Sequence, residues 1–331
     1  MEIIDVVGID VSKLTIDVVI HKSKVYCQFD NSNKGFRILC KWALSQSKIE
    51  RKNLLFVFEH TGLYSHQLAV YLSKKEFNFS IVPGLEIKRS LGISRGKDDK
   101  IDAAKIARYA YRLRDEIEPS ILPSQELQNL KNLLTLRDRM VKQRAGYKAS
   151  LKEMKRVLKL KNNVILFTTQ ERIIASLDKQ IAKIEEQMDQ IIQCNEKLKR
   201  QRNLMISITG IGQQTALYMI VNTAGFSKFK NSRCFASYCG IAPFPNSSGT
   251  SVRGKTKVSS LANKKMKSLL DLAAKSAIQH NVEMRLYYNK RIEEGKSKMS
   301  TINIIRNKLL SRIFAVVKRD SPYVNTMSYA A

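Results

Sequence analysis

Short apolar runs alternate with polar segments through the first third of the chain. Runs rich in β-branched residues favour strands, and apolar positions that recur every three or four residues favour helices. Strands are predicted at 3–9, 14–20, 25–29, 54–58 and 79–82, and helices at 36–44 and 63–72. Three hairpin strands followed by alternating helices and strands predict an α/β domain with a mixed sheet over residues 1–118.

A long helical region is predicted over residues 119–202. The stretch 126–158 is rich in polar residues and almost free of Gly and Pro. A second stretch carries apolar residues three or four positions apart: Ile174, Leu177, Ile181, Ile184, Met188 and Ile191. Because this heptad seam cannot bury itself on a single helix, we expect an antiparallel helical hairpin within the chain, a dimerising coiled coil, or both.

The last part, residues 203–331, is predicted to be mainly helical with loops that contain Gly and Ser. Residues 208–216 have the pattern of a helix-hairpin-helix element, whose glycine-rich turn lets backbone N–H groups meet a DNA phosphate. Gly210 and Gly212 are the expected contacts, and a plain turn between helices is the alternative. An amphipathic helix is expected at 263–278, with Lys264 and Lys265 near its start.

The charge balance of the chain points to a polyanionic partner. Lys and Arg outnumber Asp and Glu by 58 to 29, which gives a formal net charge of +29 over 331 residues. Nucleic acid is favoured over a membrane surface, because no apolar run reaches the roughly 18 residues of a membrane span and no basic amphipathic helix has an aromatic apolar face. The remaining alternative is a protein whose basic charge serves only to keep it soluble.

The cysteines and the N-terminus indicate a cytoplasmic protein. The 5 Cys and 4 His residues show neither CxxC pairs nor a zinc-ligand spacing. The N-terminus lacks the basic segment, apolar stretch and cleavage site of a secretion signal. We therefore expect the protein to work in a reducing cytoplasm.

Four acidic residues stand out against this basic background. Asp10 and Glu59 lie where two apolar runs end, and Asp99 and Asp102 lie three positions apart at the start of an apparent helix. Carboxylates are the hard oxygen ligands that Mg²⁺ takes, and two such ions can activate a nucleophile and stabilise a leaving oxygen. The pattern predicts a Mg²⁺ site, with Mn²⁺ as an alternative ion. Taken singly, each acid is also explained by a turn or a helix cap.

The N-terminal pattern resembles two known groups of proteins. Its strand order is that of a ribonuclease H-like domain, and the segment GIDVSK at residues 8–13 also resembles the phosphate loop of actin-like sugar kinases, which share this order. A kinase has no need of the paired Asp99 and Asp102, and the basic C-terminal third gives that interpretation little support.

Serine residues lie in a basic segment near residue 250. Ser248 precedes Gly249, and Arg253, Lys255 and Lys257 follow. Serine beside glycine is ordinarily turn chemistry. Basic side chains can also bind the phosphate that a serine hydroxyl attacks and can stabilise the alkoxide. The segment therefore supplies a candidate nucleophile and three candidate nucleic-acid contacts.

Together these motifs resemble the insertion-sequence-110 family of DEDD transposases, which includes the Piv-type DNA invertases. The motifs follow the family's order through nearly the whole chain: GIDVSK, FEHTGLY, KDDKIDA, TGIGQQTA, YCGIAP and NSSGTSVRGKTKVSSLANKKMKSLL. The resemblance implies a RuvC-like domain at 1–118, a coiled-coil spacer at 119–202 and a C-terminal transposase domain at 203–331.

The resemblance also implies an activity and the residues that perform it. Asp10, Glu59, Asp99 and Asp102 match the metal tetrad, and Ser248 matches the nucleophilic serine, with Ser247 as the neighbouring alternative. In the family's scheme the serine attacks the scissile phosphate and holds the broken strand as a phosphoserine ester, which conserves the bond energy for rejoining. The tetrad and its Mg²⁺ assist from a partner subunit.

The partners implied by the resemblance are donor and target DNA, a structured non-coding guide RNA encoded beside the gene, and further copies of the chain in a homodimer or homotetramer. A prokaryotic, nucleoid-associated protein is expected.

Two positions depart from the motifs that are usual in the family. Asp98 lies where Thr is common, so it is an alternative to Asp99 as the metal ligand. Ala262 lies where Gly is usual and is expected to affect a turn.

Two other functions fit parts of the sequence. A hydrolytic nuclease of the RuvC type would use the same acids to activate water on branched DNA and would not need the serine. A non-catalytic nucleic-acid-binding protein would use the basic residues alone, with the acids in structural roles. A Ser248→Ala variant separates the first rival from a recombinase, because a hydrolase would keep cutting.

Overall fold

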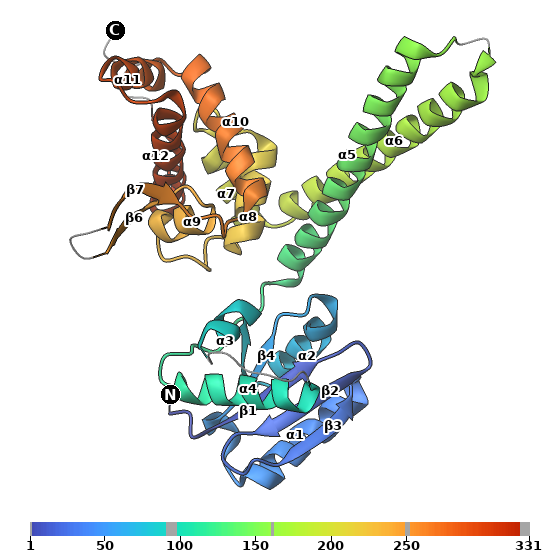
Figure 1. Ribbon diagram of the computed structural model, residues 1–331, viewed down its shortest axis with the longest axis vertical. Helices are drawn as coiled ribbons and strands as arrows, with labels where there is room; N and C mark the ends of the chain where they lie inside the picture. Colours follow the sequence, from blue (N-terminus) through green and yellow to red (C-terminus); the bar gives the residue numbers. More distant parts are fainter. Residues whose placement is uncertain (1, 91–97, 160–161, 249–251, 325–331) are drawn as a thin grey trace. The chain divides into compact units, whose positions relative to one another are not determined.

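The computed structural model describes residues 2–90, 98–159, 162–248 and 252–324. The chain forms two compact units, Met1–Leu122 and Pro123–Ala331 (Figure 1). Within the ranges described, no helix has an apolar stretch of the length needed to cross a membrane.

A five-stranded mixed sheet forms the centre of the first unit. Its strands are β1 (Asp5–Val11), β2 (Thr15–Ile20), β3 (Tyr26–Asp30), β4 (Leu54–Glu59) and β5 (Asn78–Val82). Their spatial order is β3-β2-β1-β4-β5, in which β1 pairs antiparallel with β2 and parallel with β4. The predicted mixed α/β domain is confirmed, and its strand order is consistent with a ribonuclease H-like fold.

Helices cover both faces of this sheet (Figure 1). The helices α1 (Asn33–Ser47) and α2 (Leu63–Lys74) pack on one face, against Val7 and Ile9 of β1. The helices α3 (Gly84–Ser90) and α4 (Asp99–Arg112) pack on the other face, where Val6 of β1 belongs to the core. Successive residues of β1 therefore face opposite layers, as the pleat of a strand requires.

Two details of this unit differ from the sequence pattern. β1 continues to Val11 and not only to residue 9, because Asp10 and Val11 still pair with β2, so Asp10 is the last residue but one of the strand. Thr61 is of a residue type that favours helix caps, but the capping position of α2 is held by Gly62, at a φ of +69°, without a side-chain hydrogen bond. A short 3₁₀ turn (Arg51–Asn53) precedes β4, and Glu59 is the last residue of that strand, as predicted.

A pair of long helices begins the second unit. The helices α5 (Gln125–Val157) and α6 (Val164–Gln193) form a hairpin that salt bridges tie in antiparallel register. The bridges join Arg137 to Glu185, Arg144 to Asp178 and Lys155 to Glu171. Of the predicted seam, the side chains buried in the hairpin are Ile174, Ile181, Ile184 and Met188. This part of the seam is therefore covered within a single chain.

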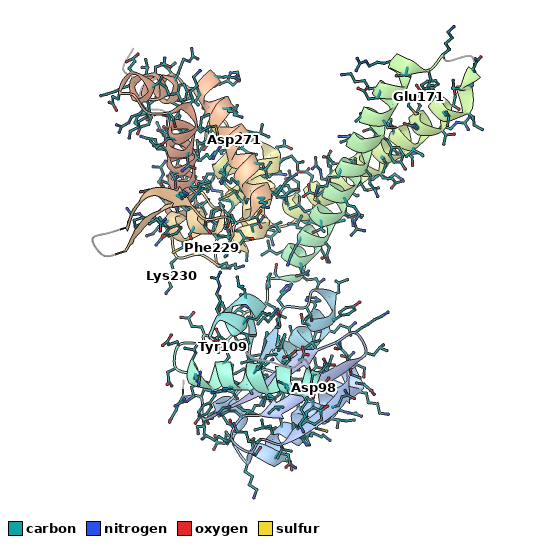
Figure 2. All side chains as sticks on the ribbon, viewed as in Figure 1. Asp98, Tyr109, Glu171, Phe229, Lys230 and Asp271 are labelled. Carbon is teal, nitrogen blue, oxygen red and sulfur yellow. The ribbon has the colours of Figure 1, made fainter. Side chains whose placement is uncertain are left out.

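The rest of the second unit is mainly helical. Its helices are α7 (Glu196–Ile206), α8 (Gln213–Thr223), α9 (Ser232–Tyr238), α10 (Lys264–His280), α11 (Val282–Glu293) and α12 (Lys298–Arg319). Their buried side chains form one apolar cluster, which also includes Leu130 of α5 and Met188 of α6. The buried Arg306 of α12 forms an ion pair with Asp271 of α10, which Figure 2 labels.

A two-stranded ribbon occupies the segment that was expected to be loop. The strands β6 (Pro243–Ser248) and β7 (Val252–Val258) pair antiparallel with each other. Pro243 and Pro245 weakened the strand signal because proline lacks an N–H group. A ribbon of two strands tolerates them, since each strand has a free outer edge. The register shifts between Phe244 and Asn246, where Pro245 lies.

Candidate active site

Gly8 allows the backbone of α4 to lie directly on β1. A Cβ atom at Gly8 would lie 2.3 Å from the backbone nitrogen of Ala107 and 2.5 Å from the carbonyl oxygen of Ala103, both in α4. No side chain fits in that space. Asp10 lies two residues farther along β1, so its side chain is on the same face of the sheet, toward the first turn of α4.

The paired acids occupy the first turn of α4, as predicted. Asp99 lies one helical turn before the buried Ala103, and Asp102 lies one turn before the buried Ile106. Residues four apart share a face of a helix, so both acids continue the side of α4 that packs on the sheet. Asp98 lies at the N-cap of α4 (Figure 2), where its Oδ1 accepts a hydrogen bond of 3.3 Å from the backbone N–H of Lys100. Helix capping therefore accounts for Asp98.

Glu59 reaches the same region from β4. The last paired residues of β1 and β4 are Ile9 and Phe58, so Asp10 and Glu59 are the next positions on two neighbouring parallel strands. A Cβ atom at Gly84 would lie only 1.6 Å from Oε1 of Glu59. The carboxylate of Glu59 therefore lies directly against the Cα of Gly84, at the start of α3.

The charges of these residues act on Asp10. Its pKa is raised from 3.8 to about 6, mainly because burial penalises the charged form, and then because of the negative charges of Asp99, Asp102, Asp17 and Glu59. All four acids expected from the sequence thus gather in one part of the first unit. Asp102 is partly neutralised, since its Oδ1 lies 2.7 Å from Nζ of Lys105.

The acids fit a divalent cation by their chemistry. Within the described ranges, no three His, Cys, Asp or Glu side chains converge closely enough to hold a metal ion. The donor set is nevertheless all oxygen, as Mg²⁺ prefers. A bound cation would also relieve the repulsion from the neighbouring acids, which adds to the effect of burial in raising the pKa of Asp10. Asp10, Glu59, Asp99 and Asp102 are the residues that would hold it.

Asp17 is an acid of this region that the sequence analysis missed. It lies on β2 directly opposite Asp10 and is only 1% exposed. Its Oδ1 accepts hydrogen bonds from the hydroxyl of Tyr26, at 2.6 Å, and from Nε2 of Gln28, at 3.0 Å. The hydrogen bond to Asp17 raises the pKa of Tyr26 to about 12. The available signal was an acid inside the apolar run TIDVVI, at a position where both neighbours are buried.

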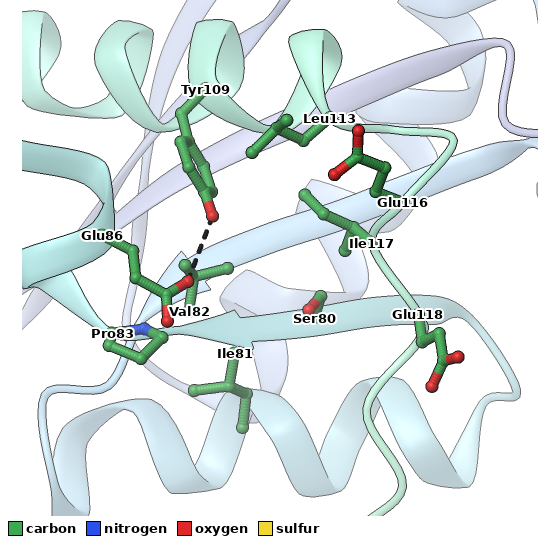
Figure 3. Close-up of a pocket in the computed structure, with 10 residues that line it drawn as sticks. All are labelled: Ser80, Ile81, Val82, Pro83, Glu86, Tyr109, Leu113, Glu116, Ile117 and Glu118. Atoms are coloured by element: carbon green, nitrogen blue, oxygen red, sulfur yellow. Dashed lines mark hydrogen bonds between the residues drawn. The ribbon is translucent and has the colours of Figure 1, made fainter. Parts of the chain in front are cut away.

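A separate pocket of about 410 Å³ lies between β5 and the end of α4 (Figure 3). Its walls include Glu86, Glu116 and Glu118, and the hydroxyl of Tyr109 donates a hydrogen bond of 3.2 Å to Glu86. None of the four predicted acids lines it. Because three carboxylates repel a phosphate, this pocket does not suit the backbone of DNA.

The candidate nucleophile lies on the ribbon of the second unit. Ser247 pairs with Arg253, and Ser248, the last residue of β6, pairs with Val252. Arg253, Lys255 and Lys257 occupy every second position of β7. Gly249, which completes the predicted Ser-Gly motif, lies outside the described residues.

Asparagine side chains fix the two chain segments at the base of the ribbon. Before β6, the carbonyl oxygen of Ile241 accepts hydrogen bonds from Nδ2 of Asn303, at 2.9 Å, and of Asn307, at 3.1 Å. After β7, Nδ2 of Asn263 donates to Oδ1 of Asn222 and to the hydroxyl of Tyr238. Asn263 also caps α10. The base of the ribbon is therefore fixed to three helices and to the start of a fourth.

The glycine-rich turn joins α7 to α8. Gly210 has a φ of +95°, and a Cβ there would lie 2.6 Å from the carbonyl oxygen of Ala273, so close packing on α10 requires this glycine. Gly212 is exposed and caps α8 without a side-chain hydrogen bond. That arrangement leaves backbone N–H groups at the start of α8 to other acceptors. Phosphate binding by this turn stays a prediction.

The predicted lysines of α10 differ in their surroundings. The first turn of α10 contains no acid, so Lys264 and Lys265 add positive charge to the positive end of the helix dipole. Nζ of Lys265 lies 3.0 Å from Oδ1 of Asp138 in α5, whereas the side chain of Lys264 is exposed. Part of the charge of Lys265 is therefore balanced within the chain.

Comparison with known proteins assigns the chain to a family. Residues 7–160 match a family model described as a transposase of the IS110 type with a DEDD motif, and residues 202–289 match the model of the transposase IS116/IS110/IS902 family. A pilin gene-inverting protein of Moraxella bovis is 30% identical over 96% of this chain and 97% of its own length. The chain belongs to the IS110 family of transposases.

More distant relatives agree with this assignment. The transposase for insertion sequence element IS1111A of Coxiella burnetii is 24% identical over 70% of this chain and 69% of its own length. An uncharacterized 43.6 kDa protein of insertion element IS110 from Streptomyces coelicolor is 27% identical over 38% of this chain and 30% of its own length. As an IS110 family member, the protein is an enzyme that cleaves and rejoins DNA.

Proposed function

We propose that this IS110 family member is a site-specific recombinase of an insertion sequence that cuts and rejoins DNA through a serine phosphodiester. Ser248 supplies the nucleophile, and Asp10, Glu59, Asp99 and Asp102 hold Mg²⁺ or Mn²⁺. The observation that carries the proposal is the half-buried Asp10 with other carboxylates around it. Burial first, and then the charges of Asp99, Asp102, Asp17 and Glu59, raise its pKa to about 6 within a chain of net charge +29. A protein that only bound nucleic acid would gain nothing from such repulsion.

The chemistry conserves phosphodiester bonds. The hydroxyl oxygen of Ser248 bonds to the scissile phosphorus while the bond from that phosphorus to one deoxyribose oxygen breaks. The hydroxyl loses its proton, and the departing oxygen gains one. No water is consumed, so a deoxyribose hydroxyl can reverse the step by attacking the phosphoserine. Mg²⁺, when the acids bind it, supplies Lewis-acid stabilisation of the negative charge on the transferring phosphate.

The remaining residues position the DNA. The bonds to Ile241 and from Asn263 fix the base of the ribbon and so limit where Ser248 can reach. Arg253, Lys255 and Lys257 follow the serine along the chain and neutralise phosphates beside the cut. Lys264 and the turn with Gly210 and Gly212 bind phosphates farther away, without reading sequence.

The reaction requires more than one copy of the chain and a guide. In the family's scheme the acids of one subunit assist the serine of another, so a homodimer or homotetramer is the active form. Recognition of donor and target DNA is delegated to a structured non-coding RNA, which suits a chain of net charge +29. Sequencing the RNA that copurifies with the full-length protein tests this part of the proposal. A single structured species transcribed from beside the gene is expected, and random cellular RNA contradicts it.

Strand cleavage by serine variants tests the proposed reaction. End-labelled DNA spanning the element junction is incubated with the protein, the copurified RNA and Mg²⁺, and products are resolved on denaturing gels. Ser248→Ala is expected to abolish both DNA cutting and the shift in gel mobility that covalently attached protein causes. Ser247→Ala is expected to retain both. Cutting by Ser248→Ala at the rate of the unaltered protein contradicts the proposal and indicates a hydrolytic nuclease.

A further inference from the structure

Asp17 faces Asp10 across two paired strands. The two residues are direct partners in the antiparallel ladder of β1 and β2. Directly opposed side chains lie on the same face of a sheet, with Cβ atoms about 4.5–5.5 Å apart. Asp17 is 1% exposed, and its charge is one of those that act on Asp10.

The two carboxylate oxygens of Asp17 have different surroundings. Oδ1 accepts hydrogen bonds from Tyr26 and Gln28, both on β3. Oδ2 is also buried, but among the described residues no group donates a hydrogen bond to it. A buried carboxylate oxygen without a donor is costly, so native proteins rarely leave one without a water, an ion or another partner.

The groups on this face of the sheet limit what the ligand can be. Val19, Ala103 and Ala107 form an apolar cluster against Tyr26 on the same face. Nζ of Lys100, in the first turn of α4, lies 5.1 Å from the centre of the Tyr26 ring and not on the carboxylate. The other charged groups that act on Asp10 are acids. These acids would repel an anionic ligand, whereas a hydrated cation satisfies both Asp10 and Asp17.

We propose that Asp17 is a fifth acid of the metal centre, a positioning residue whose free Oδ2 orients the hydrated divalent cation that Asp10 binds. Tyr26 and Gln28 fix the carboxylate through Oδ1 and leave Oδ2 for this task. Mg²⁺ usually keeps several of its waters when it binds protein, and acceptors for those waters strengthen binding. The inference rests on the proposed function, because it requires that Asp10 holds the cation.

Mn²⁺ binding to the full-length protein tests this inference without measuring activity. The free ion is followed by electron paramagnetic resonance during titration of the unaltered protein and of single variants. Asp17→Asn is expected to weaken Mn²⁺ binding about tenfold or more. Asp10→Asn is expected to abolish it. Asp5→Asn is the matched control, since Asp5 is equally buried on β1 but its Oδ1 already accepts bonds from two backbone N–H groups.

Stability in the absence of metal separates positioning from a structural role. The amide introduced by Asp17→Asn keeps the oxygen that Tyr26 and Gln28 bind and places an N–H donor where two carboxylates repelled each other. The urea midpoint of this variant is therefore expected to equal or exceed that of the unaltered protein. Tyr26→Phe, which removes one anchor of Oδ1, is expected to weaken Mn²⁺ binding less, by about threefold. If Asp17→Asn does not fold, Mn²⁺ binding by Tyr26→Phe tests the role of Asp17 in its place.

The outcomes distinguish this inference from the function on which it rests. Unchanged Mn²⁺ affinity in Asp17→Asn and Tyr26→Phe, with binding lost in Asp10→Asn, overturns the role of Asp17 and leaves the acid tetrad in place. Unchanged affinity in Asp10→Asn overturns both. Weakened affinity in Asp17→Asn together with a preserved urea midpoint supports the fifth acid.

Discussion

The two proposed halves of the reaction are held by different kinds of structure. The acids lie on a five-stranded sheet and on a helix whose backbone touches that sheet at Gly8. Ser248 lies at the far end of a two-stranded ribbon, whose base is fixed by side-chain hydrogen bonds. The acid centre therefore depends on the buried packing around it, whereas the serine centre depends on one hydroxyl group and on the hydrogen bonds at the base of its ribbon.

The largest expected effect is loss of catalysis when the charge of the acid centre changes. Asp10→Asn keeps the size of the side chain but cannot hold a cation as a carboxylate does. Strand cleavage is expected to fall about 10³-fold or more, which corresponds to roughly 4 kcal/mol of transition-state stabilisation. Gel assays of cleavage measure it, with Asp5→Asn as the control that retains activity. Cleavage within about threefold of that by the unaltered protein would show that Asp10 does not hold a catalytic metal ion.

Gly8→Ala is expected to break the packing that brings the acids together. The new methyl group meets backbone atoms of α4 that cannot move alone, so the free energy of unfolding of the first unit is expected to drop by about 3 kcal/mol. Urea denaturation followed by circular dichroism measures the change. Gly146→Ala in α5 is the opposite control, since a Cβ at that position would have no atom within 4 Å, and it is expected to stabilise by about 0.5–1 kcal/mol. Equal effects of the two variants would contradict the packing argument.

Gly84→Ala is expected to disturb the acid centre without unfolding it. The group that its methyl meets is the flexible end of Glu59, so the carboxylate moves and the fold remains. Cleavage is expected to fall about 10- to 100-fold, because small displacements of catalytic groups are costly, while the free energy of unfolding changes by less than about 1 kcal/mol. A double-mutant cycle with Glu59→Gln sharpens the result. Once the carboxylate is gone, Gly84→Ala should add little, and a full additive loss would refute this mechanism.

The pH dependence of stability gives a smaller effect. The pKa of Asp10 is raised to about 6 in the folded protein from an ordinary value of 3.8, so between these values the folded state binds more protons than the unfolded state. Stability attributable to Asp10 therefore falls as pH rises from about 4 to 6 and then levels off. Solvent screening of a half-buried group limits the loss to about 1–2 kcal/mol.

Comparison with Asp10→Asn isolates this contribution. In metal-free buffer the free energy of unfolding of the variant is expected to equal that of the unaltered protein near pH 4. At about pH 7.5 the variant is expected to be more stable, by about 1–2 kcal/mol. Urea midpoints at the two pH values measure it. A difference that does not change with pH would show that the neighbouring acids do not act on Asp10.

Much of the acid centre was predictable because a sheet obeys simple rules. Apolar runs of β-branched residues marked its strands, and the end of β4 placed Glu59 correctly. The role of Asp98 was not predictable, because a helix cap and a metal ligand favour the same residue types. Asp17 was missed because an acid inside an apolar run indicates only a buried acid, and the pairing of β1 with β2 is needed to show that it faces Asp10.

The serine centre was less predictable from physical pattern. Pro243, Pro245 and Gly254 hid the two strands of the ribbon, although a ribbon with free edges tolerates them. The assignment of Ser248 came from the resemblance to the IS110 family and not from periodicity or charge. The helical hairpin was clearer, since its seam at Ile181 and Ile184 is buried as the heptad spacing requires.

The central claim is that the early acids and Ser248 act on the same phosphodiester of DNA. The most direct measurement is mass spectrometry of peptides from protein trapped on labelled junction DNA, with Mg²⁺ and with either the unaltered chain or Asp10→Asn. A nucleotide attached to Ser248 is expected in the unaltered protein and none in Asp10→Asn. A nucleotide on another residue, or an equal yield of the Ser248 adduct in Asp10→Asn, would contradict it.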